Sequence, residues 1–220
     1  MPRRPPPEGG PPLLVACALG IERFALRGGR GGDRTPVVTL RTGMGPQSAE
    51  RAMAKALRQG AVTEHSPVIA SGFCAGLAPG MRPGDLVVAD RTRDHRPGAP
   101  EVTCHDNDML RRALRARGLT VHTGLLCGSD HVVRGAERAE LHAAGAVAVD
   151  MESAATLRAA AGSGDGPVRP VAAVRVVVDA PEHELVRIAT VRGGISAFRV
   201  LRSVLPVFFE WHRSLLLPRR

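Results

Sequence analysis

Three carboxylates each follow an apolar stretch that predicts a β-strand. They are Glu22 after Leu13–Ala18, Glu152 after Ala146–Val149, and Asp179 at the end of Pro170–Val178. Carboxyl groups act as general acids and bases, and they also bind sugar hydroxyls. Partial burial favours the neutral form of a carboxyl, which a general acid needs. Each acid taken alone is weak evidence, because a carboxylate after a strand often caps a helix or lies at the surface.

The stretch around Glu152 has the clearest local pattern. The apolar run Ala146–Val149 is followed by Asp150, Met151 and Glu152, and then by an alanine-rich helical pattern. Met151 and Glu152 therefore belong at the carboxyl end of a strand, where open α/β sheets bind their ligands. We expect Glu152 to face a ligand and Asp150 to start the helix.

Two glycine-rich segments, Gly43–Pro46 and Gly72–Gly76, also follow predicted strands. Turns of this kind let backbone N–H groups approach an anion or a ribose. Neither segment matches a Walker loop or the dinucleotide fingerprint. Each could equally be a tight turn with no ligand.

The elements that must position these residues alternate along the chain, which predicts one α/β domain. We expect a central mixed, twisted sheet flanked by helices over residues 13–217, after a disordered tail over residues 1–12. Arg91–Pro100 is expected to be a polar loop, and Ala180–Arg192 a candidate lid. The predicted strands are Leu13–Ala18, Pro36–Leu40, Pro67–Ser71, Leu86–Ala89, Leu119–Leu126, Ala146–Val149 and Pro170–Val178; the predicted helices include Gln47–Arg58, Asp108–Arg117, Ala136–Ala144 and Gly194–Leu217.

Composition narrows the class of protein. The formal net charge is +9, almost all of it from arginine, and Lys55 is the only lysine. Aromatic residues make up 3% of the chain and do not alternate with basic ones, which argues against a nucleic-acid partner. The run Leu13–Leu19 is too short to span a membrane. The cysteines have no metal-like or redox spacing, in keeping with a cytoplasmic protein that has no metal site. Three of the four lie in apolar contexts and are expected to be small buried hydrophobes. The four are Cys17, Cys74, Cys104 and Cys127.

Several motifs in order carry a family resemblance. They are Ala18-Leu19-Gly20-Ile21-Glu22, Thr42-Gly43-Met44-Gly45, Ser71-Gly72-Phe73-Cys74-Ala75-Gly76-Leu77, Gly84-Asp85-Leu86-Val87-Val88, Gly128-Ser129-Asp130, Val149-Asp150-Met151-Glu152-Ser153-Ala154-Ala155 and Arg175-Val176-Val177-Val178-Asp179-Ala180. The chain resembles the family of purine nucleoside phosphorylases and methylthioadenosine/S-adenosylhomocysteine nucleosidases over Leu13 to Phe209. Within it, the chain is most similar to the hopanoid-associated phosphorylases, which are thought to remove adenine from adenosylhopane.

The resemblance implies cleavage of the N-glycosidic bond of a purine nucleoside through an oxocarbenium-like transition state. It implies that Asp179 is the acid near purine N7. Glu152 would hold the ribose hydroxyls with Met151 packed on the sugar, and Glu22 would activate water. It further implies no cofactor other than phosphate as a co-substrate, and an assembly of at least two copies of the chain.

The chain departs from the family pattern where the phosphorylases hold phosphate. Ala70 stands in place of an arginine, and Phe73, directly after Gly72, stands in place of a serine. Phosphate would then need other cations such as Arg23 or Arg41. Because Glu22 is also present, we expect hydrolysis rather than phosphorolysis, with phosphorolysis as the alternative.

A second departure concerns the base. Val132 and Val133 occupy the positions where nucleosidases carry an adenine-stacking aromatic. His131 beside them contacts either the ligand or an ordinary surface partner. The missing aromatic and Phe73 favour an alternative, in which the protein is a catalytically weak nucleoside-binding or membrane-associated scaffold.

The segment Gly194–Leu217 predicts an amphipathic helix with arginines on its polar side. It either packs on the sheet or touches lipid with its end, as an enzyme peripheral to the membrane and acting on a lipid-linked adenine nucleoside would. The apolar positions are Ile195, Phe198, Leu201, Val204, Leu205, Phe208, Phe209, Trp211 and Leu215–Leu217.

Overall fold

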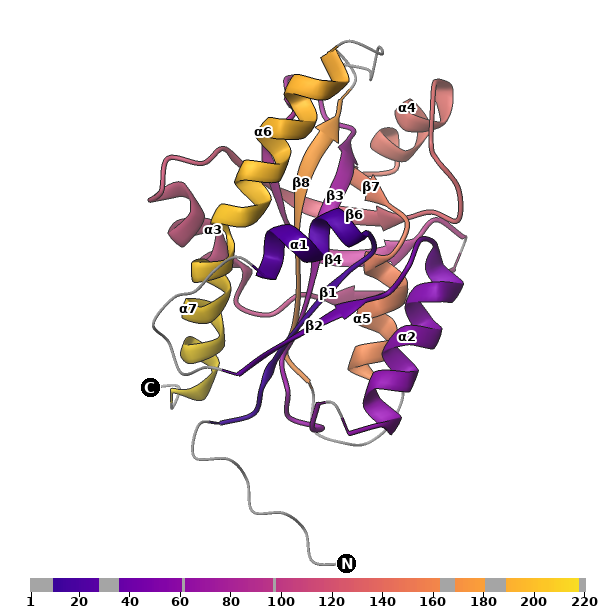
Figure 1. Ribbon diagram of the computed structural model, residues 1–220. Coiled ribbons are helices and arrows are strands. Elements are labelled where there is room, and N and C mark those ends of the chain that lie inside the picture. The colour runs from indigo at the N-terminus through magenta and orange to yellow at the C-terminus, as the bar shows by residue number, and fades with distance from the viewer. Residues whose placement is uncertain are drawn as a thin grey trace, which may run out of the picture.

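The computed structural model describes residues 10–27, 36–60, 62–96, 98–162, 169–180 and 189–217. Strands and helices alternate through most of this part of the chain (Figure 1). The strands are β1 Leu13–Cys17, β2 Val37–Arg41, β3 Val68–Gly76, β4 Leu86–Asp94, β5 Glu101–Thr103, β6 Val121–Gly128, β7 Ala146–Asp150 and β8 Val171–Asp179. The helices are α1 Gly20–Arg27, α2 Pro46–Arg58, α3 Asn107–Arg115, α4 Ala136–Ala143, α5 Ser153–Ala161, α6 Ala189–Ser203 and α7 Leu205–Leu216.

The strands form one mixed sheet in the order β2-β1-β3-β7-β6-β4-β5, with β8 paired to both β3 and β4. Most pairs are parallel, whereas β3–β7, β4–β5 and β4–β8 are antiparallel. Because β8 joins β3 to β4, the strands β3, β7, β6, β4 and β8 are paired in a closed ring. The expected single α/β domain with a mixed central sheet is confirmed.

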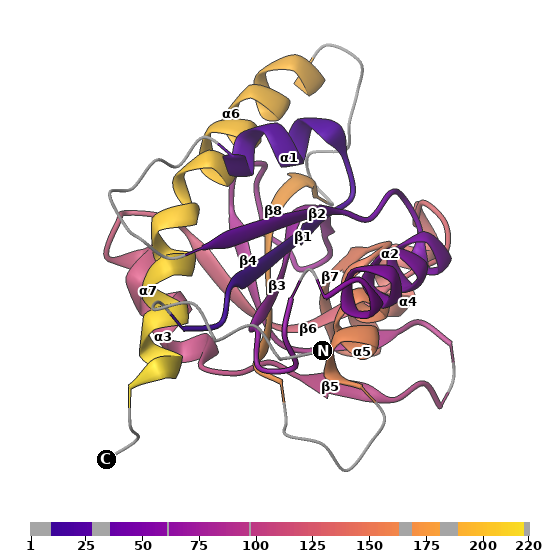
Figure 2. The same cartoon turned by 60° about the horizontal axis from the view of Figure 1, so that its bottom comes forward.

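Helices cover the sheet on two sides, as Figure 2 shows. Helices α1, α3, α6 and α7 contribute to one apolar cluster, and α2 and α5 to the other. The strands between them are mostly aliphatic, with Arg175 in β8 as a charged exception: β1 is fully buried and β8 is buried from Val171 to Val177. Continuous apolar strands of this kind require cover on both faces. The two layers of helices therefore hold in place the edge of the sheet at which the predicted site residues lie.

Two predicted loops or turns are strands. Strand β4 continues to Asp94 and pairs with β5, so the expectation of a loop over Arg91–Pro100 is wrong for Arg91–Asp94. Thr92 and Asp94 are buried while Arg91 is exposed, which is the alternation of a strand with one face in the protein. The turn predicted at Gly72–Gly76 is the second half of β3.

The C-terminal segment forms two helices, α6 and α7, where one was predicted. Pro206 lies in the first turn of α7 and has no N–H to continue the ladder of α6. Leu201, Phe208 and Trp211 are buried in the core, and the Trp211 indole N–H donates to the His105 carbonyl at 2.9 Å. This packing favours the alternative in which the segment covers the sheet. In the described ranges, no helix has the length and hydropathy needed to cross a membrane.

Parts of two predictions fall on residues that are not described. Residues 1–9 of the predicted tail lie outside the described ranges. Of its last three residues, Pro11 has its carbonyl oxygen 2.8 Å from His212 Nε2. Residues 181–188 of the candidate lid are also outside the described residues, and helix α6 begins at Ala189.

Candidate active site

A cavity of about 260 Å³ opens where β1, β3, β7 and β8 end, a size near the lower limit for small-molecule sites. Its walls bring together residues that are up to 161 positions apart in sequence, from Ala18 to Asp179. Seven of the eight predicted site residues line it. They are Glu22, Phe73, Val132, Val133, Met151, Glu152 and Asp179. The eighth, Gly72, lies directly behind Glu22.

Glu22 lies in the first turn of α1 and is only 2% exposed. Its Oε2 accepts hydrogen bonds from the backbone N–H groups of Ala18 at 2.9 Å and Leu19 at 2.8 Å. Its Oε1 accepts one from Phe73 N–H at 2.8 Å. An ionised carboxylate offers about four acceptor sites. One site on Oε1 therefore remains for a ligand or water in the cavity.

Gly72 lets Glu22 and Arg175 approach β3 closely. A Cβ at Gly72 would lie 2.7 Å from Arg175 Nη1 and closer still to Glu22 Oε1. The residue has φ +143°, a conformation that glycine adopts without strain. The glycine that the sequence placed in a ligand-binding turn thus makes room for two charged side chains.

Glu152 stands at the start of α5, at the end of the stretch that the sequence singled out. Its Oε1 accepts from the backbone N–H of Gly45 at 2.9 Å, and Gly45 belongs to the predicted turn Gly43–Pro46. Burial and the neighbouring Asp150 carboxylate raise the pKa of Glu152 to about 7, while Arg175 acts in the opposite direction. Glu152 therefore changes its charge near neutral pH inside the cavity.

A buried ion pair lies beneath Glu152. Arg175, on β8, is 1% exposed; its Nε lies 2.6 Å from Asp150 Oδ2 and donates to Ser153 Oγ at 2.8 Å. Burial lowers the pKa of Arg175, but the carboxylates of Asp150, Glu152 and Glu22 raise it further, so the net shift is upward. Asp150 Oδ1 also accepts from the backbone N–H groups of Glu152 and Ser153, which fits the expected helix-start role.

Asp179, the last residue of β8, forms an ion pair with Arg138 of α4. The pair joins Asp179 Oδ2 to Arg138 Nη2, and Arg138 Nε also donates to the Val133 carbonyl at 3.2 Å. Asp179 Oδ1 and Arg138 Nη1 are buried and have no hydrogen-bond partner. Among the described residues that line the cavity, these are the two side chains with a buried, unpaired polar atom.

Comparison with known proteins shows the family of this chain. The family model described as the phosphorylase superfamily matches residues 23–206. The chain belongs to the phosphorylase superfamily. The resemblance seen in the sequence is therefore established at the level of the superfamily.

Proteins similar to this superfamily chain include enzymes named as nucleosidases and as a hydrolase. The 5'-methylthioadenosine/S-adenosylhomocysteine nucleosidase of Haemophilus ducreyi is 28% identical over 142 residues, which span 56% of this chain and 60% of that protein. The Neisseria meningitidis nucleosidase of the same name, solved with methylthio-immucillin-A, has a TM-score of 0.73 at 22% identity, covering 90% of this chain and 97% of that one. Futalosine hydrolase of Helicobacter pylori has a TM-score of 0.74 at 15% identity, covering 90% and 97%. The two structures show a shared fold.

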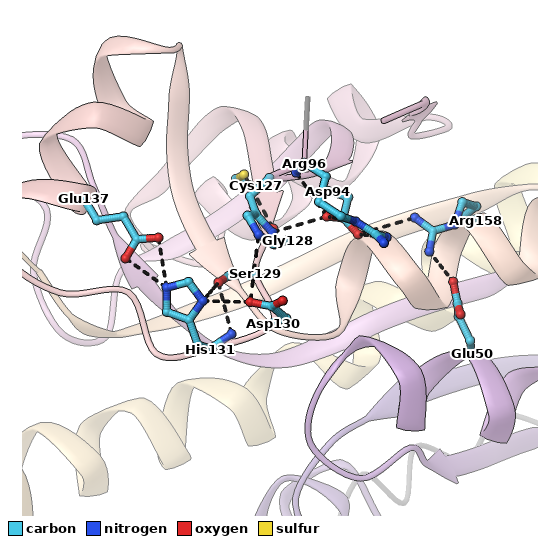
Figure 3. A network of polar contacts seen from close by, with 11 residues as sticks. Glu50, Asp94, Arg96, Cys127, Gly128, Ser129, Asp130, His131, Glu137 and Arg158 are labelled. Atoms are coloured by element: carbon cyan, nitrogen blue, oxygen red, sulfur yellow. Dashed lines mark hydrogen bonds and ion pairs between the residues drawn. The ribbon is translucent and has the colours of Figure 1, made fainter. Parts of the chain in front are cut away.

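In this superfamily chain, a polar network holds the loop that carries His131, Val132 and Val133 (Figure 3). His131 lies between two carboxylates, with Nδ1 2.7 Å from Asp130 and Nε2 3.0 Å from Glu137. Hydrogen bonds to these two groups raise the pKa of His131. His131 lines the cavity as well, so the two alternatives for it are both compatible with its position.

The two arginines that the sequence suggested as phosphate ligands do not line this cavity. Arg23 lines a different cavity, between α1, β2 and α7, and Arg41 is exposed at the end of β2. All four cysteines are buried and free, and burial raises the pKa of Cys127, for example, to about 11. Over the described part of the chain, no group of three His, Cys, Asp or Glu side chains is placed to hold a metal ion.

Sequence reasoning missed two arginines that pair with carboxylates at the site. Arg175 had a usable signal, because a charged residue inside the β-branched run of β8 must find a partner when the strand is buried. Arg138 had none: it lies on a polar helix that carries three other charged or titratable side chains, and only the tertiary structure brings it to Asp179.

Proposed function

We propose that this protein hydrolyses the N-glycosidic bond of an adenine nucleoside. The observation that carries the proposal is the meeting of Glu22, Glu152 and Asp179 at the walls of one cavity, from three separate parts of the sequence. Membership of the phosphorylase superfamily and the nucleosidase relative support it.

In this proposal the two ends of the cavity act on different parts of the nucleoside. Glu152 accepts hydrogen bonds from the ribose hydroxyls, Met151 packs on the sugar, and Asp179 with Arg138 faces the purine. The C1′–N9 bond breaks and its electron pair goes to the base. Water adds to C1′ and passes a proton to the free acceptor site of Glu22, and that proton ends on the departing adenine. General base help of this kind contributes about 10²- to 10⁴-fold in rate.

Water is the acceptor we propose in place of phosphate. Phosphate at neutral pH carries between one and two negative charges and is bound by arginines, lysines or helix N-termini. Within the described residues, the one arginine that lines the cavity is Arg138, and Asp179 already engages it. Among the described residues, no arginine or lysine lines the cavity end beside Glu22, and Arg175 beneath it is already paired with Asp150, which favours a neutral nucleophile.

The walls of the cavity favour an apolar group on the 5′ position of the nucleoside. Met44 and Val132 line the cavity and are each 57% exposed, and the exposed Ile21 and Phe24 lie on the same helix as Glu22. A thioether or a lipid would suit this surface. We therefore include adenosylhopane among the candidates. A second copy of the chain could cover the same apolar side chains, and we propose a homodimer on that ground.

The direct test follows adenine release by chromatography from 5′-methylthioadenosine, S-adenosylhomocysteine and adenosylhopane, with and without phosphate. We expect free adenine together with free sugar, at a rate independent of phosphate. We expect Glu22→Gln to lower kcat by about 10²-fold or more. Glu210→Gln, a paired carboxylate on α7, is the matched control and should leave kcat unchanged.

Three outcomes would contradict the proposal. A sugar 1-phosphate formed only with phosphate would show phosphorolysis. Saturable nucleoside binding without product, by a folded protein, would favour the alternative of a binding or scaffold protein. Full activity of Glu22→Gln would remove Glu22 from the mechanism.

A further inference from the structure

The base end of the cavity holds an unpaired donor beside an unpaired acceptor. Arg138 is 7% exposed, and its Nη1 is buried without a partner, whereas its Nε and Nη2 are engaged by Val133 and Asp179. Asp179 Oδ1, the carboxylate oxygen that is not engaged in the ion pair, is also buried without a partner. Arg138 and Asp179 both line the cavity. Buried polar groups in native proteins are nearly always paired, so an unmatched donor and acceptor on two side chains that line one cavity indicate a ligand.

We infer that Arg138 recognises and stabilises the leaving purine: its Nη1 donates a hydrogen bond to purine N7, while Asp179 Oδ1 accepts one from the 6-amino group. This inference rests on the proposed function, because it needs an adenine nucleoside in the cavity. It assigns the N7 donor to Arg138 and makes Asp179 an acceptor, whereas the family resemblance implied that Asp179 is the acid.

The hydrogen-bonding pattern of the base supports this assignment. The edge of adenine that carries N7 presents an acceptor at N7 and a donor at the 6-amino group. The same edge of a 6-oxopurine presents two acceptors, N7 and O6. A donor from Arg138 next to an acceptor from Asp179 matches the edge of adenine. With a 6-oxopurine, the acceptor Asp179 Oδ1 would face the acceptor O6.

The chemistry of the two side chains supports it as well. An ionised carboxylate only accepts hydrogen bonds, and a guanidinium only donates them and keeps its charge at all working pH values. When the C1′–N9 bond breaks, negative charge builds on the purine, and a positive donor at N7 stabilises that charge. No proton leaves Arg138 in this step. The proton that adenine finally carries comes from the attacking water, through Glu22.

Nucleoside analogues that lack N7 provide the sharpest experiment. Dissociation constants of 5′-methylthioadenosine and its 7-deaza analogue are compared at low temperature on wild type and on Arg138→Met, in Glu22→Gln backgrounds to prevent turnover. We expect the wild-type site to prefer the N7-containing ligand by about tenfold or more, the value of a hydrogen bond to a charged group. We expect Arg138→Met to bring this ratio close to one.

Arg169→Met is the matched control. Arg169 is also 7% exposed and donates to the carbonyls of Ala160, Thr63 and Ser66, but it does not line the cavity. Arg169→Met shows how the loss of a buried arginine that does not line the cavity affects ligand binding. We expect this variant to keep the preference for the N7-containing ligand. If Arg138→Met fails to fold, Arg138→Lys and the wild-type preference between the two ligands still decide the matter.

The outcomes separate this inference from the proposed function. If wild type releases adenine but shows no preference for N7, or if Arg138→Met keeps the preference, Arg138 does not bind N7. If inosine is cleaved faster than adenosine, the cavity binds another purine edge and the inference is wrong. If wild type cleaves neither, the proposed function fails first.

Discussion

The two ends of the cavity differ in how completely their charged groups are paired. At the Glu22–Glu152 end, three backbone N–H groups hold Glu22, Gly45 holds Glu152, and Arg175 with Asp150 forms a closed pair underneath. At the Asp179 end, one ion pair leaves a donor and an acceptor without partners. The first end is organised before any ligand arrives, as electrostatic catalysis requires. The second end is completed by the ligand, which suits recognition of a particular base.

Among the tests of this difference between the two ends, Arg175→Met is expected to have the largest effect on stability. It removes the partner of Asp150 where both side chains are 1% exposed, so a buried carboxylate is left unpaired. Loss of one partner of a buried ion pair costs about 3–5 kcal/mol in the free energy of unfolding. Arg138→Met should cost less, because Asp179 is 17% exposed and water can reach it.

Denaturant unfolding of the two variants measures the difference in stability between the two ends. If Arg138→Met proves as destabilising as Arg175→Met, the contrast between a closed and an open end does not hold. Arg169→Met again shows what a buried arginine contributes without a carboxylate partner.

A smaller effect is expected from Gly72→Ala. The added Cβ would meet Glu22 and lie 2.7 Å from Arg175 Nη1, and φ +143° is strained for alanine. We expect a loss of about 1–3 kcal/mol in the free energy of unfolding, together with a fall in kcat, because Glu22 must move. Gly118→Ala is the control: it has φ +75° but no atom within 4 Å of the new Cβ. Equal losses of stability and unchanged kcat in both variants would show that strain alone matters.

The smallest effect concerns the pH dependence of stability at Glu152. Its pKa is about 7 in the folded protein and near its ordinary value of 4.5 in the unfolded chain, so the folded state binds the proton more tightly. The resulting stabilisation is fully present below about pH 4.5 and is lost as the pH rises through about 7.

Glu152→Gln cannot lose that proton. Its Tm minus that of wild type should therefore grow between pH 4.5 and pH 7.5, by on the order of 5 °C. The exposed Glu140→Gln should show no such trend. A constant difference for Glu152→Gln across this range would contradict the raised pKa.

The sequence by itself determined the fold class and the three carboxylates of the cavity. Apolar runs in β1, β7 and β8 predicted their strands, and Glu22, Glu152 and Asp179 stood just past those runs or at their end. This succeeded because burial on both faces leaves a strong local pattern, and because the carboxyl ends of these strands gather at one place.

Only the tertiary structure decided what surrounds each carboxylate. The sequence contains Gly45, Arg138 and Arg175 but does not state that they meet Glu152, Asp179 and Asp150, up to 107 positions away. These pairings depend on how β3, β7 and β8 close on one another, which no local pattern encodes. A hydrogen bond is made over about 3 Å, and long-range packing alone sets distances on that scale between distant parts of a chain.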